Sequence, residues 1–255
     1  MRRAGLAALS LIAPLAACQP ADIAAPVVLS CPHGAGADCL AGGAGALAQA
    51  VAGAYVRVVI YEQGGARDMP GRDVVNGASG TIIDRRGLVV TPAHIAKDRR
   101  FAAAVTTIDG RVHPATIVDV APSRELALLK IAPGPGIRTP DRADPRALGP
   151  GRPVLAIGTP NNTPGVVSHG HVRTPRLDQR ITYAEYGYND AIELEMEIEP
   201  GHSGGPLFDT EGRLIGMLAS FGLGNTRQVP YVSTRLAYAI PASAIDAYIA
   251  EVAPP

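Results

Sequence analysis

The sequence predicts an all-β fold of two packed barrels followed by one C-terminal helix. Its 255 residues include 29 glycines and 23 prolines but no tryptophan, and they form short β-branched clusters divided by turn residues. This pattern is typical of many short strands rather than of long helices. With 47% hydrophobic residues, a chain of this length can bury a full core in one or two domains.

Roughly a dozen segments have the alternating or β-branched composition of strands. They are residues 56–61, 80–84, 87–91, 102–108, 112–120, 126–131, 154–157, 165–173, 191–198, 205–208, 214–221 and 237–240. The step from Asp84 to Gly87 predicts a hairpin connection. Ile245, Tyr248 and Ile249 are spaced three and four residues apart after Pro241, which predicts a helix over residues 242–252.

The charges of the chain balance. Lys and Arg total 23, as do Asp and Glu, so the formal net charge is zero. A neutral chain has no long-range field that gathers polyanions. We therefore expect no nucleic-acid partner.

The N-terminus has the pattern of an export signal. Met1-Arg2-Arg3 supplies positive charge, and residues 4–17 form a mostly apolar run that ends in small residues. This run is shorter than the ~20 residues that a membrane-spanning helix needs. We therefore assign residues 1–17 to a signal peptide.

The end of this run carries a second signal. Leu15-Ala16-Ala17-Cys18 resembles the lipobox of bacterial lipoproteins, in which cleavage precedes the cysteine and the cysteine is acylated. The resemblance implies that Cys18 is a lipid anchor, which would hold the protein at the membrane of the bacterial cell envelope with its folded part in the periplasm. A plain signal peptide with an incidental cysteine is the alternative.

The residues that follow are poor in core-forming side chains. Residues 18–50 are rich in Ala, Gly and Pro, so we expect a low-complexity tether. Cys31 and Cys39 lie eight residues apart and could close a disulfide loop in an oxidising compartment. Together with His33 they could also be metal ligands, but a structural zinc site normally has four. We expect no metal.

The strongest local motif is Gly201-His202-Ser203-Gly204-Gly205-Pro206-Leu207, which lies between two strand-like runs. Glycines on both sides of a serine allow a tight turn that aims backbone N–H groups at a point beside the hydroxyl. Such a turn is suited to stabilise an oxyanion. A glycine-rich turn with an incidental serine is the alternative interpretation.

A family resemblance follows from this motif and its neighbours. Residues 201–207 and 209–216 resemble the nucleophile segment of HtrA/Deg serine peptidases, and residues 79–94 resemble their histidine segment. Shorter matches occur at residues 126–131, 156–160 and 239–241. The resemblance implies a chymotrypsin-like fold of two six-stranded antiparallel Greek-key barrels over residues 51–255, divided near residues 140–150. It also implies a serine endopeptidase, here without the PDZ domain of many relatives.

Carried over to this chain, the resemblance makes Ser203 the nucleophile and His94 the general base and then acid. It also makes the N–H groups of Gly201 and Ser203 the oxyanion donors. A serine hydroxyl is a weak nucleophile until a base removes its proton, and an imidazole with an ordinary pKa of about 6.5 can do so near neutral pH. This chemistry requires no cofactor.

The third member of the triad departs from the family. Relatives place an aspartate directly before the Leu-Ala-x-Leu-Lys strand, and this chain has Glu125 there. Glutamate keeps the charge but adds roughly 1.5 Å of reach, so we expect a Ser-His-Glu triad. Asp119 is the alternative carboxylate. A catalytically impaired trypsin-like lipoprotein that binds peptides or acts as a scaffold is the alternative function, and a purely structural lipoprotein is a third.

The sequence says less about the substrate. Leu194, Met196 and Ile198 alternate with glutamates, which predicts a half-buried strand with these three side chains inward. Glu197 lies six residues before Ser203, at the position that the chymotrypsin fold places at the base of the primary pocket. An acidic pocket for Arg or Lys is therefore one hypothesis, and a solvated strand face is the other. We expect protein or peptide substrates, and the oligomeric state stays open.

Overall fold

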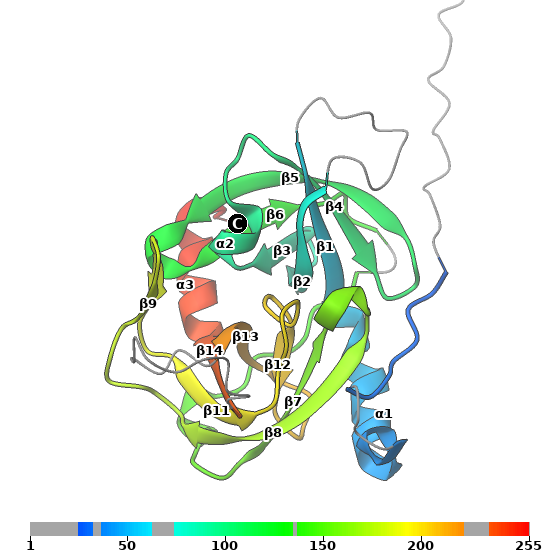
Figure 1. Ribbon diagram of the computed structural model, residues 1–255, viewed down its shortest axis with the longest axis vertical. Helices are drawn as coiled ribbons and strands as arrows, with labels where there is room; N and C mark the ends of the chain where they lie inside the picture. Colours follow the sequence, from blue (N-terminus) through cyan, green and yellow to red (C-terminus); the bar gives the residue numbers. More distant parts are fainter. Residues whose placement is uncertain (1–24, 33–36, 63–73, 135–136, 222–234, 255) are drawn as a thin grey trace, which may run out of the picture.

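The computed structural model describes residues 25–32, 37–62, 74–134, 137–221 and 235–254. The predicted signal peptide and Cys18 lie outside these residues. Two closed barrels account for most of the described chain (Figure 1). The predicted all-β class, with two six-stranded antiparallel barrels and a C-terminal helix, is therefore confirmed.

The first barrel pairs its strands in the order β1-β2-β3-β6-β5-β4 and closes through β1 and β4. Successive side chains alternate between the barrel interior and its outer face, and in β3 and β6 the outer face is buried as well. The strands are β1 (Tyr55–Tyr61), β2 (Val74–Asp84), β3 (Leu88–Thr91), β4 (Ala102–Thr107), β5 (Val112–Ala121) and β6 (Leu126–Lys130).

The second barrel pairs its strands in the order β11-β14-β13-β12-β7-β8. A separate hairpin, β9 (Ile181–Tyr183) and β10 (Tyr186–Tyr188), stands between β8 and β11 and was not expected from the sequence. The barrel strands are β7 (Pro153–Gly158), β8 (Val166–Thr174), β11 (Ile192–Met196), β12 (Pro206–Phe208), β13 (Leu214–Phe221) and β14 (Leu236–Pro241).

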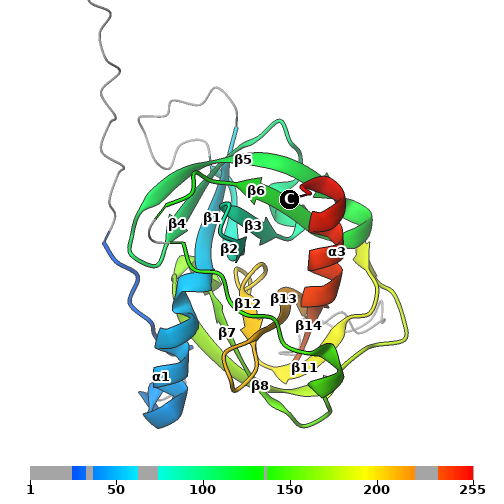
Figure 2. The same cartoon turned by 180° about the vertical axis from the view of Figure 1, so that it is seen from behind.

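Helices are few and short. The longer ones are α1 (Gly42–Val51) and α3 (Ala242–Val252), and α2 (Ala93–Ala96) is a single turn. In both views α1 and α3 lie on opposite sides of the barrels (Figures 1 and 2). Single 3-10 turns complete the described elements: η1 (Ala37–Leu40), η2 (Ala52–Ala54), η3 (Pro122–Arg124), η4 (Pro145–Ala147) and η5 (Pro160–Asn162).

Three groups of buried side chains hold this arrangement. One fills the first barrel and another fills the second, where Leu194, Met196 and Ile198 all lie inside as the alternation predicts. The third lies between the barrels and includes Ile245 and Tyr248 of α3. Burying such side chains contributes about 1.5–3 kcal/mol each, so α3 binds the two barrels together.

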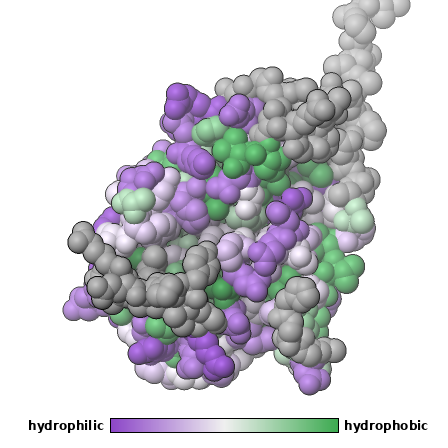
Figure 3. Space-filling view, viewed as in Figure 1, coloured by the Kyte–Doolittle hydropathy of each residue, from purple (hydrophilic) through white to green (hydrophobic). Residues whose placement is uncertain are grey.

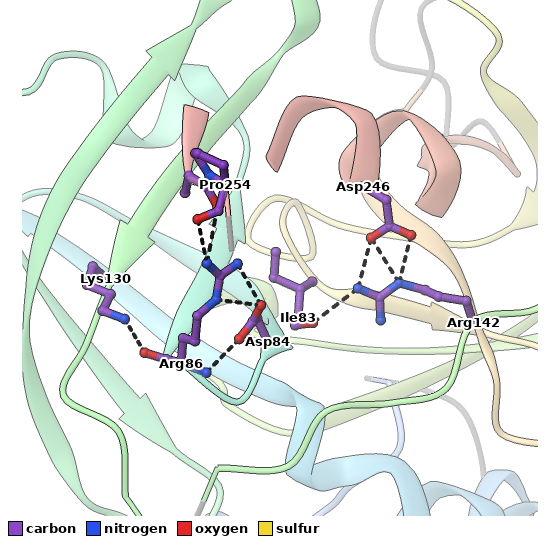
Figure 4. A network of polar contacts seen from close by, with 8 residues as sticks. Ile83, Asp84, Arg86, Lys130, Arg142, Asp246 and Pro254 are labelled. Carbon is purple, nitrogen blue, oxygen red and sulfur yellow. Dashed lines mark hydrogen bonds and ion pairs between the residues drawn. The ribbon is translucent and has the colours of Figure 1, made fainter. Parts of the chain in front are cut away.

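Polar contacts reinforce this junction (Figure 4). Arg142, in the connection between the barrels, pairs with Asp246 of α3 at 3.0 Å and donates to the carbonyl of Ile83 in β2 at 3.1 Å. Arg86, in the β2–β3 turn, donates to the carbonyl of Pro254 at 2.9 Å. The C-terminal helix is therefore bonded to the first barrel and to the connection that leads to the second.

Part of the expected tether belongs to the fold. Residues Gly42–Val51 form α1, and Ala48 and Val51 are buried in the group of side chains between the barrels. Tertiary burial of this kind stabilises a helix whose Gly-rich sequence would not form one alone. Cys31 and Cys39 are joined by a disulfide with Cα atoms 5.8 Å apart, and the Cys39 carbonyl accepts a hydrogen bond from His169 of β8 at 2.8 Å.

The face seen in Figure 1 is mostly polar, and its hydrophobic residues form small separate groups (Figure 3). Val28 and Val74 are the large hydrophobic side chains that are exposed among the described residues. None of the helices that the structure describes is long and apolar enough to cross a membrane.

Candidate active site

His94 stands at the end of the first barrel's β2–β3 hairpin. Its helix α2 begins directly after β3, with Pro92 at the N-cap, and anchors itself through the buried side chains of Ala93 and Ile95. The His94 side chain lies on the open side of this turn and is 26% exposed. A short rigid turn thus presents the imidazole to the space between the barrels.

Glu125 faces His94 from the turn before β6. The residue has a left-handed backbone with φ of 55°, which ends the η3 turn and directs its side chain inward. Its side chain is fully buried, and Oε1 makes a hydrogen bond with Nδ1 of His94. The structure therefore brings together the histidine and the carboxylate that the sequence pairs, in spite of the longer side chain.

A third group completes this contact. Tyr183, at the end of β9, donates a hydrogen bond from its hydroxyl to the same Oε1 of Glu125 and lies 3.3 Å from Nδ1 of His94. Burial, and then the charge of Glu125, raise the pKa of the Tyr183 hydroxyl well above its ordinary value, so it stays a proton donor. The other oxygen of Glu125, Oε2, is buried and has no hydrogen-bond partner among the described residues.

The nucleophile segment begins with a type II β-turn. His202 N–H donates to the carbonyl of Glu199 at 3.1 Å, Pro200 occupies the second position, and Gly201 has φ of 102° at the third. This is the arrangement that favours proline and then glycine. A Cβ on Gly201 would lie 2.2 Å from the carbonyl oxygen of Thr159, so a larger residue does not fit.

The two predicted oxyanion donors are unused within the described part of the chain. The N–H groups of Gly201 and Ser203 donate to no other described residue, whereas those of His202, Gly204 and Gly205 all do. Two unpaired amides on either side of His202, one of them within a fixed turn, are suited to receive a negative oxygen.

The nucleophile segment is docked on the hairpin that carries His94. Ser79 N–H donates to the carbonyl of Ser203 at 3.0 Å, and Thr81 Oγ1 donates to the carbonyl of Gly204 at 2.9 Å. Gly204 has φ of 93°, and a Cβ there would lie 1.9 Å from the carbonyl oxygen of Ser79. This close approach of two backbones requires glycine and joins the two halves of the site.

Ser203 itself is nearly buried. Its Oγ donates to the carbonyl of Ala219 in β13 at 3.2 Å, and among the described residues it has no hydrogen bond to His94. Rotation about one side-chain bond between staggered positions would release Ala219 and redirect the hydroxyl. In this structure the Ser203 hydroxyl is therefore directed at Ala219.

His202, next to Ser203, is a structural residue. Nδ1 accepts a hydrogen bond from the N–H of Glu199 at 3.0 Å, and Nε2 contacts Oγ of Ser168 at 3.0 Å. Burial lowers the pKa of His202 to about 4, so its imidazole is neutral near neutral pH. A Cβ on Gly158 would lie 2.7 Å from the His202 ring, which means that Gly158 makes the room for it.

Two further candidates lie elsewhere. Asp119 accepts a hydrogen bond from the hydroxyl of Tyr248 in α3 at 2.8 Å, so it stabilises the helix and is not the carboxylate of His94. Glu197 is exposed on the face opposite Met196 and Ile198, just past the end of β11. Among the described residues, no group of His, Cys, Asp or Glu side chains is arranged to hold a metal ion.

Sequence reasoning missed Tyr183 and the role of Ser79. Ser79 Oγ donates to the carbonyl of Gly201 at 2.7 Å and accepts from the N–H of Thr159 at 2.9 Å, so it supports the turn that contains Gly201. Ser79 stands at the start of residues 79–94, the segment that resembles the histidine segment of HtrA/Deg peptidases, and this position was the sequence signal for its role. Tyr183 lies 58 residues from Glu125 along the chain and carries no motif of its own.

Two barrels with a histidine, a buried carboxylate and a serine in a glycine turn at their junction define the class of trypsin-like serine peptidases. A family model described as a trypsin-like peptidase domain matches residues 78–217, and the chain belongs to this family.

Individual proteins that are similar to the chain are also serine proteases. The chain is 32% identical over 190 residues to the serine protease HTR4 of Bos taurus, a match that covers 73% of this chain and 36% of that protein. It is 30% identical over 177 residues to the serine protease PepD of Mycobacterium tuberculosis, covering 64% of this chain and 38% of PepD. The chain thus spans just over a third of the length of these curated relatives.

Proposed function

We propose that the chain is a serine endopeptidase of the bacterial cell envelope that cleaves peptide bonds with Ser203, His94 and Glu125. The observation that carries the proposal is the hydrogen bond between the buried Glu125 carboxylate and Nδ1 of His94. This bond fixes the imidazole so that Nε2 faces away from the carboxylate and is available as the base. The turn that contains Ser203 is docked on the hairpin that leads to His94.

The reaction follows from these positions. Nε2 of His94 accepts the proton of the Ser203 hydroxyl while Oγ bonds to the substrate carbonyl carbon, and the carbonyl oxygen becomes negative. The unused N–H groups of Gly201 and Ser203 stabilise that oxygen. His94 then returns the proton to the leaving amine, the peptide bond breaks, and water hydrolyses the acyl-serine by the same steps with His94 again as base.

Hydrolysis of a denatured protein tests the activity. Purified protein should cleave unfolded casein, and Ser203→Ala should abolish cleavage while leaving the melting temperature within a few degrees of wild type. Intact casein after incubation with folded wild-type protein would contradict the proposal. That result would favour the alternative function, a catalytically impaired lipoprotein that binds peptides. The hydrogen bond from the Ser203 hydroxyl to the Ala219 carbonyl also agrees with this alternative.

A fluorogenic peptide library tests the substrate preference. If Glu197 contributes to the primary pocket, cleavage should follow Arg or Lys, and Glu197→Gln should weaken that preference. Cleavage mainly after Val or Ala that is unchanged in Glu197→Gln would contradict an acidic pocket. The exposure of Glu197 makes this comparison informative, because a pocket base is ordinarily enclosed by its walls.

The location in the envelope rests on the lipobox-like sequence before Cys18. In a bacterial host that acylates lipoproteins, the wild-type protein should incorporate labelled palmitate and fractionate with membranes. Cys18→Ser should lose the label and appear in the soluble periplasmic fraction. A wild-type protein that is processed but unlabelled would contradict the anchor and leave the peptidase activity untouched.

A further inference from the structure

The hairpin β9–β10 brings a tyrosine to the proposed triad. Tyr183 donates its hydroxyl hydrogen to Oε1 of Glu125, the same oxygen that contacts Nδ1 of His94. Its ring meets the imidazole edge-on, with ring centroids 5.9 Å apart and an interplanar angle of 72°. We propose that Tyr183 is a positioning residue that fixes the Glu125 carboxylate against His94. This inference rests on the proposed function of the site.

The carboxylate needs such support for a physical reason. Glutamate has one more rotatable bond than aspartate, so holding it in a single position costs more conformational entropy. Glu125 is fully buried, its Oε2 has no partner among the described residues, and its hydrogen bonds are both made by Oε1. Loss of the Tyr183 hydroxyl would leave His94 as the sole hydrogen-bond partner of this buried carboxylate among the residues that the structure describes.

The hydrogen bond from the tyrosine also bears on the chemical role of this carboxylate. A hydrogen bond donated to a carboxylate stabilises its ionised form. An ionised Glu125 is what stabilises the imidazolium that forms when His94 takes the serine proton. Tyr183 therefore acts on the reaction through Glu125, and it makes no hydrogen bond to Ser203 among the described residues.

The hairpin is tied to the turn that carries Glu125. Arg180, just before β9, donates from Nη2 to the carbonyl of Ser123 in η3 at 2.6 Å. In Figure 1, β9 lies on the same side of the molecule as α2. The tyrosine, the carboxylate and the histidine thus come from three segments that meet at one point, and the Arg180 bond holds two of them together.

The test compares two tyrosines of this hairpin. Tyr183→Phe removes the hydroxyl that contacts Glu125, whereas Tyr186→Phe removes a hydroxyl that makes no hydrogen bond to Glu125 or His94 among the described residues. We expect Tyr183→Phe to lower kcat roughly ten- to hundredfold with little change in KM. Tyr186→Phe should change neither quantity.

A second measurement does not depend on turnover. In protein labelled with ¹⁵N-histidine, the chemical shift of His94 Nδ1 reports its bond to Glu125, and it should change in Tyr183→Phe but not in Tyr186→Phe. An unchanged shift in folded Tyr183→Phe would overturn the positioning role, whether or not the wild-type protein cleaves peptides. If Tyr183→Phe fails to fold, Arg180→Ala takes its place, and an unchanged shift there would count against the role equally.

Discussion

Ser79 of the first barrel donates a hydrogen bond to the carbonyl of Gly201 in the second, over a distance of 2.7 Å. Ser79 is fully buried and also accepts from the N–H of Thr159, a residue that follows β7. One hydroxyl therefore joins the histidine-bearing hairpin to the turn that carries the proposed oxyanion donors. The proposed catalysis would therefore depend on how the two barrels meet.

Replacement of Ser79 tests this connection. Ser79→Ala removes both of these bonds and leaves the Thr159 N–H and the Gly201 carbonyl with their 3.3 Å hydrogen bond to each other. The free energy of unfolding should fall by about 0.5–1.5 kcal/mol for each bond lost. The Gly201 turn should loosen, so kcat should fall while KM changes little. Chemical denaturation and steady-state kinetics measure both effects. The exposed Ser243→Ala is the matched control, and equal behaviour of the two variants would contradict the connection.

The length of the Glu125 side chain, the carboxylate of the proposed triad, gives a second prediction. Glu125→Asp shortens the side chain by roughly 1.5 Å, so its carboxylate should no longer reach Nδ1 of His94 from the left-handed backbone position. We expect a lower kcat in Glu125→Asp even though aspartate is the residue of the relatives. Glu125→Gln should lose about 10³–10⁴ in kcat, because the histidine then lacks its charged partner. Full activity in Glu125→Gln, measured on folded protein, would contradict the triad.

Gly201, in the turn that carries the proposed oxyanion donors, gives a third prediction. A Cβ on Gly201 would overlap the carbonyl of Thr159, and the positive φ of Gly201 disfavours any other residue. Gly201→Ala should therefore displace a donor and lower kcat by about 10²–10³. Gly149→Ala is the control, because a Cβ there meets nothing within 4 Å. A Gly201→Ala variant with wild-type kcat would show that this amide does not bind the oxyanion.

The buried His202 gives a prediction for stability against pH. Its folded-state pKa of about 4 lies below the ordinary value of about 6.5 that applies in the unfolded chain. As the pH falls from about 6.5 to about 4, the unfolded chain binds a proton that the folded chain does not. The free energy of unfolding should therefore fall over this window, by at most about 1.4 kcal/mol per pH unit, and the loss should level off below it.

Denaturant titrations at several pH values measure this effect. His202→Asn, which cannot titrate, should show a smaller decrease in unfolding free energy between about pH 6.5 and about pH 4 than wild type. The comparison uses the pH dependence alone, so a constant destabilisation of the variant does not affect it. Identical pH dependence in the two proteins would mean that His202 is not the group responsible.

Strong local patterns made most of the fold predictable. The barrel strands are runs of β-branched and aliphatic residues between turn signals, and α3 has a clear apolar stripe. By contrast, α1 reads as a low-complexity segment, because its helix is stabilised by the burial of Ala48 and Val51 rather than by propensity. The strands β9 and β10 have three residues each, too few for a periodic signal.

The residues of the candidate site were likewise predictable only in part. Ser203, His94 and Glu125 stand in motifs whose residue types and spacing point to their chemistry. Tyr183 reaches Glu125 only through tertiary structure, across 58 residues of sequence. Local sequence patterns do not indicate a contact between residues so far apart in the chain. Glu125 could therefore be predicted, whereas its hydrogen bond with Tyr183 could not.

Covalent capture of the nucleophile tests the central claim most directly. Folded protein treated with an active-site phosphonate and analysed by intact-mass and peptide mass spectrometry should carry one adduct, on Ser203. The adduct should be absent in Ser203→Ala and should form far more slowly in His94→Ala. A folded wild-type protein that acquires no adduct at Ser203, or acquires it equally fast without His94, would contradict a serine activated by that histidine.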